Sequence, residues 1–111
     1  MRKTLIELIA SSVLLAGQSP LRDFPVGGPM GELTLPVNMQ TGAFKFTAHG
    51  FEPGTTYYLQ LHKEGYMGAG VVGSAVANPE GEVDITGKLD TEQLQLLDQN
   101  RADLSISPLV L

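Results

Sequence analysis

Short segments in which apolar and polar residues alternate, separated by glycine and proline, are the feature that most limits what this chain can fold into. In the segment 31–37, Leu33, Leu35 and Val37 alternate with Glu32, Thr34 and Pro36. Residues two apart lie on the same face of a strand. Thirteen glycines and seven prolines among 111 residues supply turns between such segments. The chain is therefore predicted to form a domain of short antiparallel strands.

Further strands are expected at 43–49, 55–63, 72–76, 83–86 and 102–107. The residues expected to face the core are Phe44, Phe46, Ala48, Tyr57, Leu59, Leu61, Val72, Ser74, Val76, Val83, Ile85, Leu104 and Ile106. The turn 78–81 has asparagine first, proline second and glycine fourth, which is typical of a type I turn and predicts a hairpin that pairs Val76 with Val83. Asp90 and Gln93 predict the capped start of a short helix that ends near Asn100.

The first 18 residues predict a secretory leader. Arg2 and Lys3 precede an apolar run from Thr4 to Ala16 that only Glu7 interrupts. A basic start, an apolar run of about 7 to 15 residues and small residues after it are typical of such leaders. A membrane-spanning helix would need about 20 apolar residues, so the run is too short for one. We expect an exported protein that is periplasmic, at the cell surface or extracellular.

The end of the leader, Leu14-Leu15-Ala16-Gly17, resembles the lipobox of bacterial prelipoproteins. In that family the next residue is a cysteine that receives the lipid, and here Gln18 takes its place. Since glutamine has no thiol to acylate, the resemblance implies an export signal but no lipid anchor. Membrane contact is expected only through the leader, if it is not cleaved.

The start of the same run, Thr4 to Leu8, is similar to the TLIEL start of type IV pilins, in which a buried glutamate sets the register of the subunits. Those proteins carry Gly-Phe before it, whereas this chain has Arg2 and Lys3. The resemblance implies an alternative function, a structural subunit of a surface fibre or layer.

Residues 19–30 contain three prolines and two glycines without an apolar period, and they predict a linker between the leader and a domain of residues 31–111. Pro36 has no N–H to donate, so the strand at 31–37 is expected at an edge of the sheet. An exposed edge can pair with another chain, and we expect it to allow homo-oligomers.

The charge balance excludes some partners. The chain has 7 basic and 12 acidic residues, and removal of Arg2, Lys3 and Glu7 leaves 5 and 11, a balance of about −6. Such a domain repels nucleic acid and anionic lipid. Cysteine is absent, so disulfides cannot stabilise the exported domain, and packing or assembly must do so.

The segment 51–57, FEPGTTY, resembles the tyrosine corner of fibronectin type III and related immunoglobulin-like domains. The resemblance implies that Pro53 and Gly54 form the corner and that the Tyr57 hydroxyl bonds back to the loop. It covers about 20 residues. The fold class expected is all-β: an immunoglobulin-like antiparallel sandwich or small barrel of about six strands, with one short helix before the last strand.

Residue patterns for catalysis or metal binding are weak. If strands 43–49 and 55–63 paired as a hairpin, His49 and His62 would lie on the order of 20 Å apart at about 3.3 Å per residue, too far for one zinc ion. Glu80, Glu82 and Asp84 share an outward strand face but lack the pattern of a calcium loop. The glycine-rich segment 65–70 precedes a strand, where a phosphate loop needs a helix. We expect no catalytic residues, no metal and no cofactor.

Aromatic and polar side chains on one strand face indicate a binding surface. Tyr58, Gln60 and His62 are expected to point outward together, with Tyr66 close after them. Flat polar groups of this kind suit contact with a protein or a carbohydrate. The sequence thus predicts a non-catalytic exported domain that binds a protein or carbohydrate partner.

Overall fold

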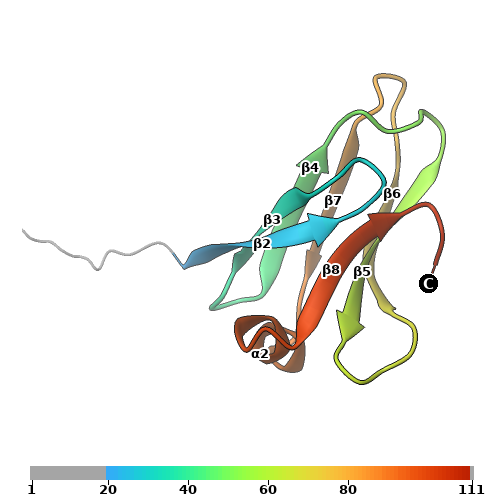
Figure 1. Ribbon diagram of the computed structural model, residues 1–111. Coiled ribbons are helices and arrows are strands. Elements are labelled where there is room, and N and C mark those ends of the chain that lie inside the picture. The colour runs from blue at the N-terminus through green and yellow to red at the C-terminus, as the bar shows by residue number, and fades with distance from the viewer. Residues whose placement is uncertain (1–19, 111) are drawn as a thin grey trace, which may run out of the picture.

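The computed structural model describes residues 20–110, and the predicted leader at 1–18 lies outside them. Seven strands and one short helix make up this part of the chain (Figure 1). In chain order they are β2 (Leu21–Gly27), β3 (Leu33–Asn38), β4 (Ala43–Ala48), β5 (Thr56–Lys63), β6 (Gly70–Val76), β7 (Val83–Lys88), α2 (Thr91–Asp98) and β8 (Ala102–Ser107). None of the helices in residues 20–110 is long and apolar enough to cross a membrane.

The strands form one mixed sheet in the order β6-β5-β8-β2-β3-β4-β7, which curls into a nearly closed barrel. The all-β class and the single short helix before the last strand are confirmed. The sheet is not purely antiparallel, because β2 and β8 run parallel through the pairs Val26–Leu104 and Gly27–Ser105. It has seven strands where about six were expected.

The additional strand is β2, which lies where a linker was predicted. Its six residue pairs with β3 include Phe24 with Leu35, and Phe24 and Val26 are buried. Burial of such side chains stabilises by about 1.5 to 3 kcal/mol each. The prediction of a linker at 19–30 is therefore wrong for Leu21–Gly27. With β3 on one side and β8 on the other, two inward side chains are enough to hold this segment as a strand.

The prediction that the strand at 31–37 lies at an edge is also wrong, because β2 pairs with it. β3 lies between β2 and β4, so it is not open to another chain. Its ladder with β4 is short and contains only the Val37–Phe44 pair, which agrees with the missing donor at Pro36.

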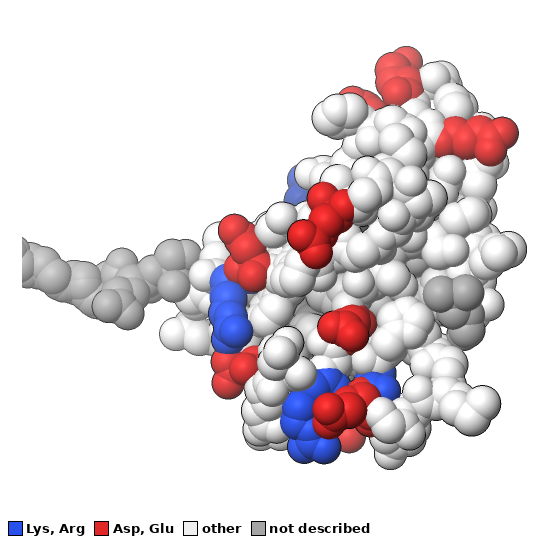
Figure 2. Space-filling view, in the orientation of Figure 1, with Lys and Arg blue, Asp and Glu red and all other residues white. Residues whose placement is uncertain are grey.

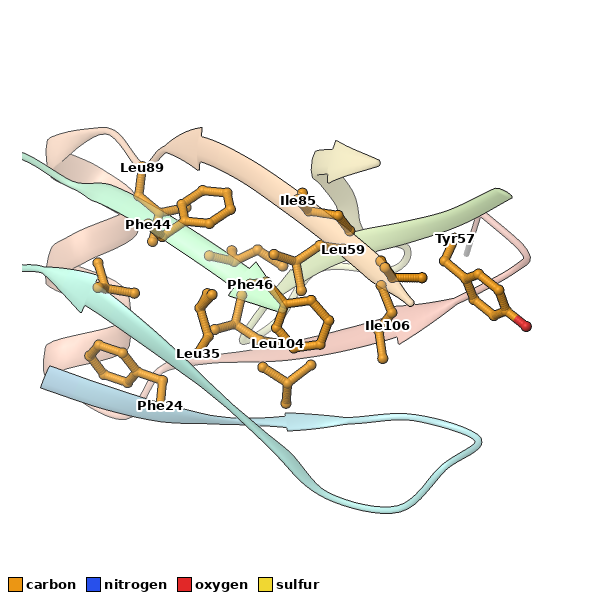
Figure 3. Packing of buried hydrophobic residues seen from close by; sticks show 14 of the residues in the cluster. Phe24, Leu35, Phe44, Phe46, Tyr57, Leu59, Ile85, Leu89, Leu104 and Ile106 are labelled. Carbon is orange, nitrogen blue, oxygen red and sulfur yellow. The ribbon is translucent and has the colours of Figure 1, made fainter. Parts of the chain in front are cut away.

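The core fills the inside of the barrel (Figure 3). Its fully buried side chains come from strands throughout the sheet and include Leu35, Phe46, Leu59, Ile85 and Ile106. The inward faces expected for the strands β3, β4, β5, β7 and β8 are therefore correct.

The strand β6 differs from its prediction in partner and in face. It pairs with β5 while β7 pairs with β4, so Val76 and Val83 do not form the predicted ladder. A bulge where β6 pairs with Leu59 and Gln60 changes the alternation, and Val76 is exposed instead of inward. The turn itself is present, since the N–H of Gly81 donates to the Asn78 carbonyl at 2.8 Å.

β6 and β7 nevertheless lie close to each other, with no ladder between them among the described strands. A Cβ atom on Gly73 would lie 2.5 Å from Cγ2 of Ile85, and one on Gly87 would lie 3.2 Å from the Val72 carbonyl oxygen. Gly73 and Gly87 therefore allow the outer strands β6 and β7 to approach each other where the barrel nearly closes.

Helix α2 begins as its sequence predicts. The side chain of Asp90 accepts from the backbone of Gln93 at 2.8 Å, and the Gln93 side chain accepts from the backbone of Asp90 at 2.9 Å. Leu97 is buried against the core and Leu94 is partly buried. The helix covers one end of the barrel, the end at which the β5–β6 loop also lies (Figure 1).

The turn between β3 and β4 connects to the segment before α2 at Gly42. Gly42 has φ of +84°, its N–H donates to the Asn38 carbonyl, and its carbonyl accepts from Leu89 N–H at 2.9 Å. A Cβ atom there would overlap the Leu89 carbonyl oxygen.

We expect Gly42→Ala to lower the free energy of unfolding by about 3 kcal/mol or more, because left-handed strain adds to a backbone overlap. Gly54→Ala is the matched control, since Gly54 has φ of +82° but open space around its Cβ position. It should cost about 1 to 2 kcal/mol. Urea unfolding of both variants measures the difference, and equal losses would show that the contact with Leu89 does not matter.

Candidate functional site

The loop between β5 and β6 carries the two most exposed large apolar side chains of residues 20–110. Tyr66 is 72% exposed and Met67 is 101% exposed. Surface-exposed methionine and tyrosine are enriched at protein interfaces. The loop therefore marks the strongest candidate contact surface of the described chain.

A cleft of about 200 Å³ lies directly beside these two side chains. Leu61 and Ala69 form part of its wall from β5 and the loop, and Gln93 contributes an amide group from α2. Drug-sized ligands need about 300 to 1,000 Å³. The cleft thus has room for one side chain or one ring and not for a large ligand.

Two ion pairs hold the base of the loop. Nζ of Lys63 lies 2.9 Å from Oε1 of Glu92, and Nε of Arg101 lies 3.0 Å from Oε1 of Glu64. The backbone N–H of Glu64 also donates to the Arg101 carbonyl at 2.9 Å. These contacts join the loop to α2 and to the start of β8.

Lys63 also orders the tip of the loop. Its carbonyl accepts from the N–H of Tyr66 at 3.1 Å, and its ammonium group lies 5.4 Å from the centre of the Tyr66 ring. A cation at this distance attracts the ring face. This contact favours an orientation of the exposed Tyr66 ring beside Lys63.

The hydrogen bond with Glu92 and its negative charge raise the pKa of Lys63 above the ordinary value of 10.5. Because the pKa of Lys63 is raised in the folded state, the ion pair makes its full contribution to stability at pH values below the pKa of Lys63 in the unfolded chain. This contribution is lost as pH rises through the folded pKa. The tie between the loop and α2 is therefore intact at neutral pH.

The four side chains predicted to form a binding surface do not lie together as an exposed group. Tyr58 is half-buried, and Gln60 is fully buried with its Nε2 donating to the Leu109 carbonyl at 2.8 Å. His62 is half-buried, and its Nε2 shares a hydrogen bond of 2.8 Å with Oγ of Ser105 on β8. Of the four, Tyr66 alone is exposed, and it lies in the loop.

The segment that resembles a tyrosine corner forms a bend before β5. The N–H of Glu52 donates to the Tyr57 hydroxyl oxygen at 3.2 Å, and the Phe51 and Tyr57 rings lie 4.6 Å apart. Pro53 and Gly54 occupy the turn, where the N–H of Gly54 donates to the Ala77 carbonyl at 2.9 Å. Tyr57 is buried and serves the fold, not a surface.

The histidines and acidic residues do not gather into a metal site. His49 follows β4 and lines a hollow with Glu82 and Asp84, whereas His62 lies on β5 beside Ser105. Within residues 20–110, no group of three or more histidine, cysteine, aspartate or glutamate side chains is placed to hold a metal ion.

A wider hollow of about 440 Å³ lies between α2, β2 and the β3–β4 turn. Its lining includes Met39 and Leu94, and the ion pair between Arg22 and Asp98 joins two of its walls. Among the described residues that line it, none is a strongly exposed apolar side chain, so the loop is the stronger candidate contact surface.

Comparisons with protein-family models, with curated proteins and with solved structures found no match to this chain.

Sequence patterns alone did not identify Lys63, Met67 and Gln93 as parts of a site. Met67 and Tyr66 stand between glycines in the segment 65–70, and these two large side chains in a glycine-rich turn were the available signal. Gln93 comes from α2, far along the chain, and only the fold brings it to the cleft.

We expect Glu92→Gln to lower the pKa of Lys63 toward its ordinary value, because both the charge and the hydrogen bond of Glu92 raise it. Glu64→Gln is the control, since Glu64 pairs with Arg101 instead. An NMR pH titration of the lysine side-chain resonances reports both variants. An unchanged Lys63 pKa in Glu92→Gln would show that the pair does not form in solution.

Proposed function

We propose that this protein is an exported, non-catalytic domain of the cell envelope or the secreted fraction that binds a protein partner through the β5–β6 loop. The observation that carries the proposal is the exposure of Tyr66 and Met67 on a loop held at its base by two ion pairs. A loop whose base is ordered before contact loses less entropy on binding than an unanchored loop. The loop thus has the properties of an interface anchor.

A protein partner is favoured over a carbohydrate because of Met67. Sugars bind to flat aromatic rings and polar groups, and Tyr66 with Gln93 would suit them. A fully exposed thioether next to the ring adds flexible apolar area of the kind found at protein-binding surfaces. A cleft with room for one side chain fits the same interpretation.

Export is supported by the basic and apolar segments at the start of the chain, Arg2 to Ala16. We expect the protein to occur outside the cytoplasm with its first residues removed. Mass spectrometry of the N-terminus of the protein recovered from membrane, periplasm and medium measures this. A full-length protein found only in the cytoplasm would contradict it.

Contact through the loop is tested with a photo-crosslinking amino acid at position 67 in the producing cell. We expect one dominant protein adduct after illumination. The control is the same amino acid at Lys45, an exposed residue on β4. Equal adducts from both positions, or none from position 67, would refute the proposed site. Binding to a glycan array that depends on Tyr66, without a protein adduct from position 67, would favour a carbohydrate partner.

A further inference from the structure

We propose that the partner which fills the cleft beside the β5–β6 loop is a second copy of this chain, whose Met67 enters the cleft across a two-fold axis. This inference rests on the proposed function, because it names the partner of the same surface. In such a dimer, the cleft of each copy is filled by Met67 of the other copy.

A projecting side chain and a hollow lie side by side on this surface. Met67 projects fully into solvent, and the cleft that it borders holds about 200 Å³. In a two-fold dimer the same patch on both copies must fit itself, so residue i contacts j and j contacts i. A knob next to a hole of single-side-chain size meets that requirement.

Charge around the loop also favours a second copy as the partner. The sequence as a whole carries a net charge of −5, so two copies repel each other on average. Around the loop, however, Lys63 and Arg101 balance Glu64 and Glu92. Figure 2 shows blue and red atoms together at the lower end, where α2 and this loop lie in Figure 1, and red atoms without blue neighbours at the upper end.

This balance leaves the patch with little net charge, because each of the four groups already pairs within its own copy. Two copies that approach through the loop therefore meet no strong repulsion there. Other orientations bring acidic groups elsewhere on the two surfaces toward each other, which costs free energy.

The chain offers variants that change each half of the contact without disturbing the fold. Met67→Ser removes the knob, and its matched control is Met30→Ser, which changes another exposed methionine away from the loop. Gly70→Leu fills the hole: Gly70 lines the cleft, pairs with the buried Leu61 and has open space at its Cβ position. Its control is Gly27→Leu, since Gly27 on β2 has open space as well.

Sedimentation equilibrium of the isolated protein over a concentration series tests the dimer. We expect a dimer whose Kd rises about hundredfold in Met67→Ser and in Gly70→Leu, because a contact worth about tenfold occurs twice across the axis. Met30→Ser and Gly27→Leu should leave the Kd unchanged. The native protein and the four variants share the same residues before Pro20. Any association through those residues therefore affects all five equally and does not change the comparison of their Kd values.

Mixing the two interface variants gives the sharpest test. The Met67→Ser copy keeps its hole and the Gly70→Leu copy keeps its knob, so one of two contacts returns. With one copy ¹⁵N-labelled, native mass spectrometry should show a heterodimer about tenfold weaker than the native dimer and stronger than either variant alone. Nonspecific apolar association would show no such recovery.

A protein that stays monomeric up to about 1 mM would overturn the inference, as would equal weakening by the control variants. If position 67 then still crosslinks to one different protein, the proposed function stands and only the identity of the partner is wrong. If position 67 gives no specific adduct, the proposed function fails as well.

Discussion

The pairing of β2 with β8 is the contact on which the rest of this structure depends. Two residue pairs, Val26–Leu104 and Gly27–Ser105, join the three strands β6, β5 and β8 to the four strands β2, β3, β4 and β7. Without it the sheet would divide into two pieces, joined by the packing of their inner faces and not by a ladder. The core is shared between these halves, so this short parallel contact sets the geometry around which all the buried side chains pack.

Local patterns in the sequence predicted most of the strands but few of their partners. Alternation over 43–49 and 55–63 identified β4 and β5 with their inward faces, because that signal needs only neighbouring residues. It did not show that β6 pairs with β5 or that β7 pairs with β4. β2 was missed since Pro20 and Pro25 hide a strand that has just two inward residues. Its stability comes from strands on either side, which no local window contains.

The same limit explains the site. Alternation correctly put Gln60 on the outer face of β5, yet the segment after β8 folds over that face and buries it. The cleft joins Lys63 and Met67 to Gln93, so its walls depend on where α2 packs. The exposure of Tyr66 was predicted from sequence because it depends mainly on the place of this residue in a glycine-rich turn. The immunoglobulin-like resemblance remains a prediction, although the Tyr57 hydroxyl does bond to the loop before it.

The parallel contact between β2 and β8 joins the first and the last strand of the described chain. Nearly the whole domain lies between its two sides, so closing it requires the ordering of a very long loop, and contacts of that kind slow folding. The barrel cannot be completed until β8 has left the ribosome. Until then the inner faces of the earlier strands lack the side chains of Leu104 and Ile106, which complete their core.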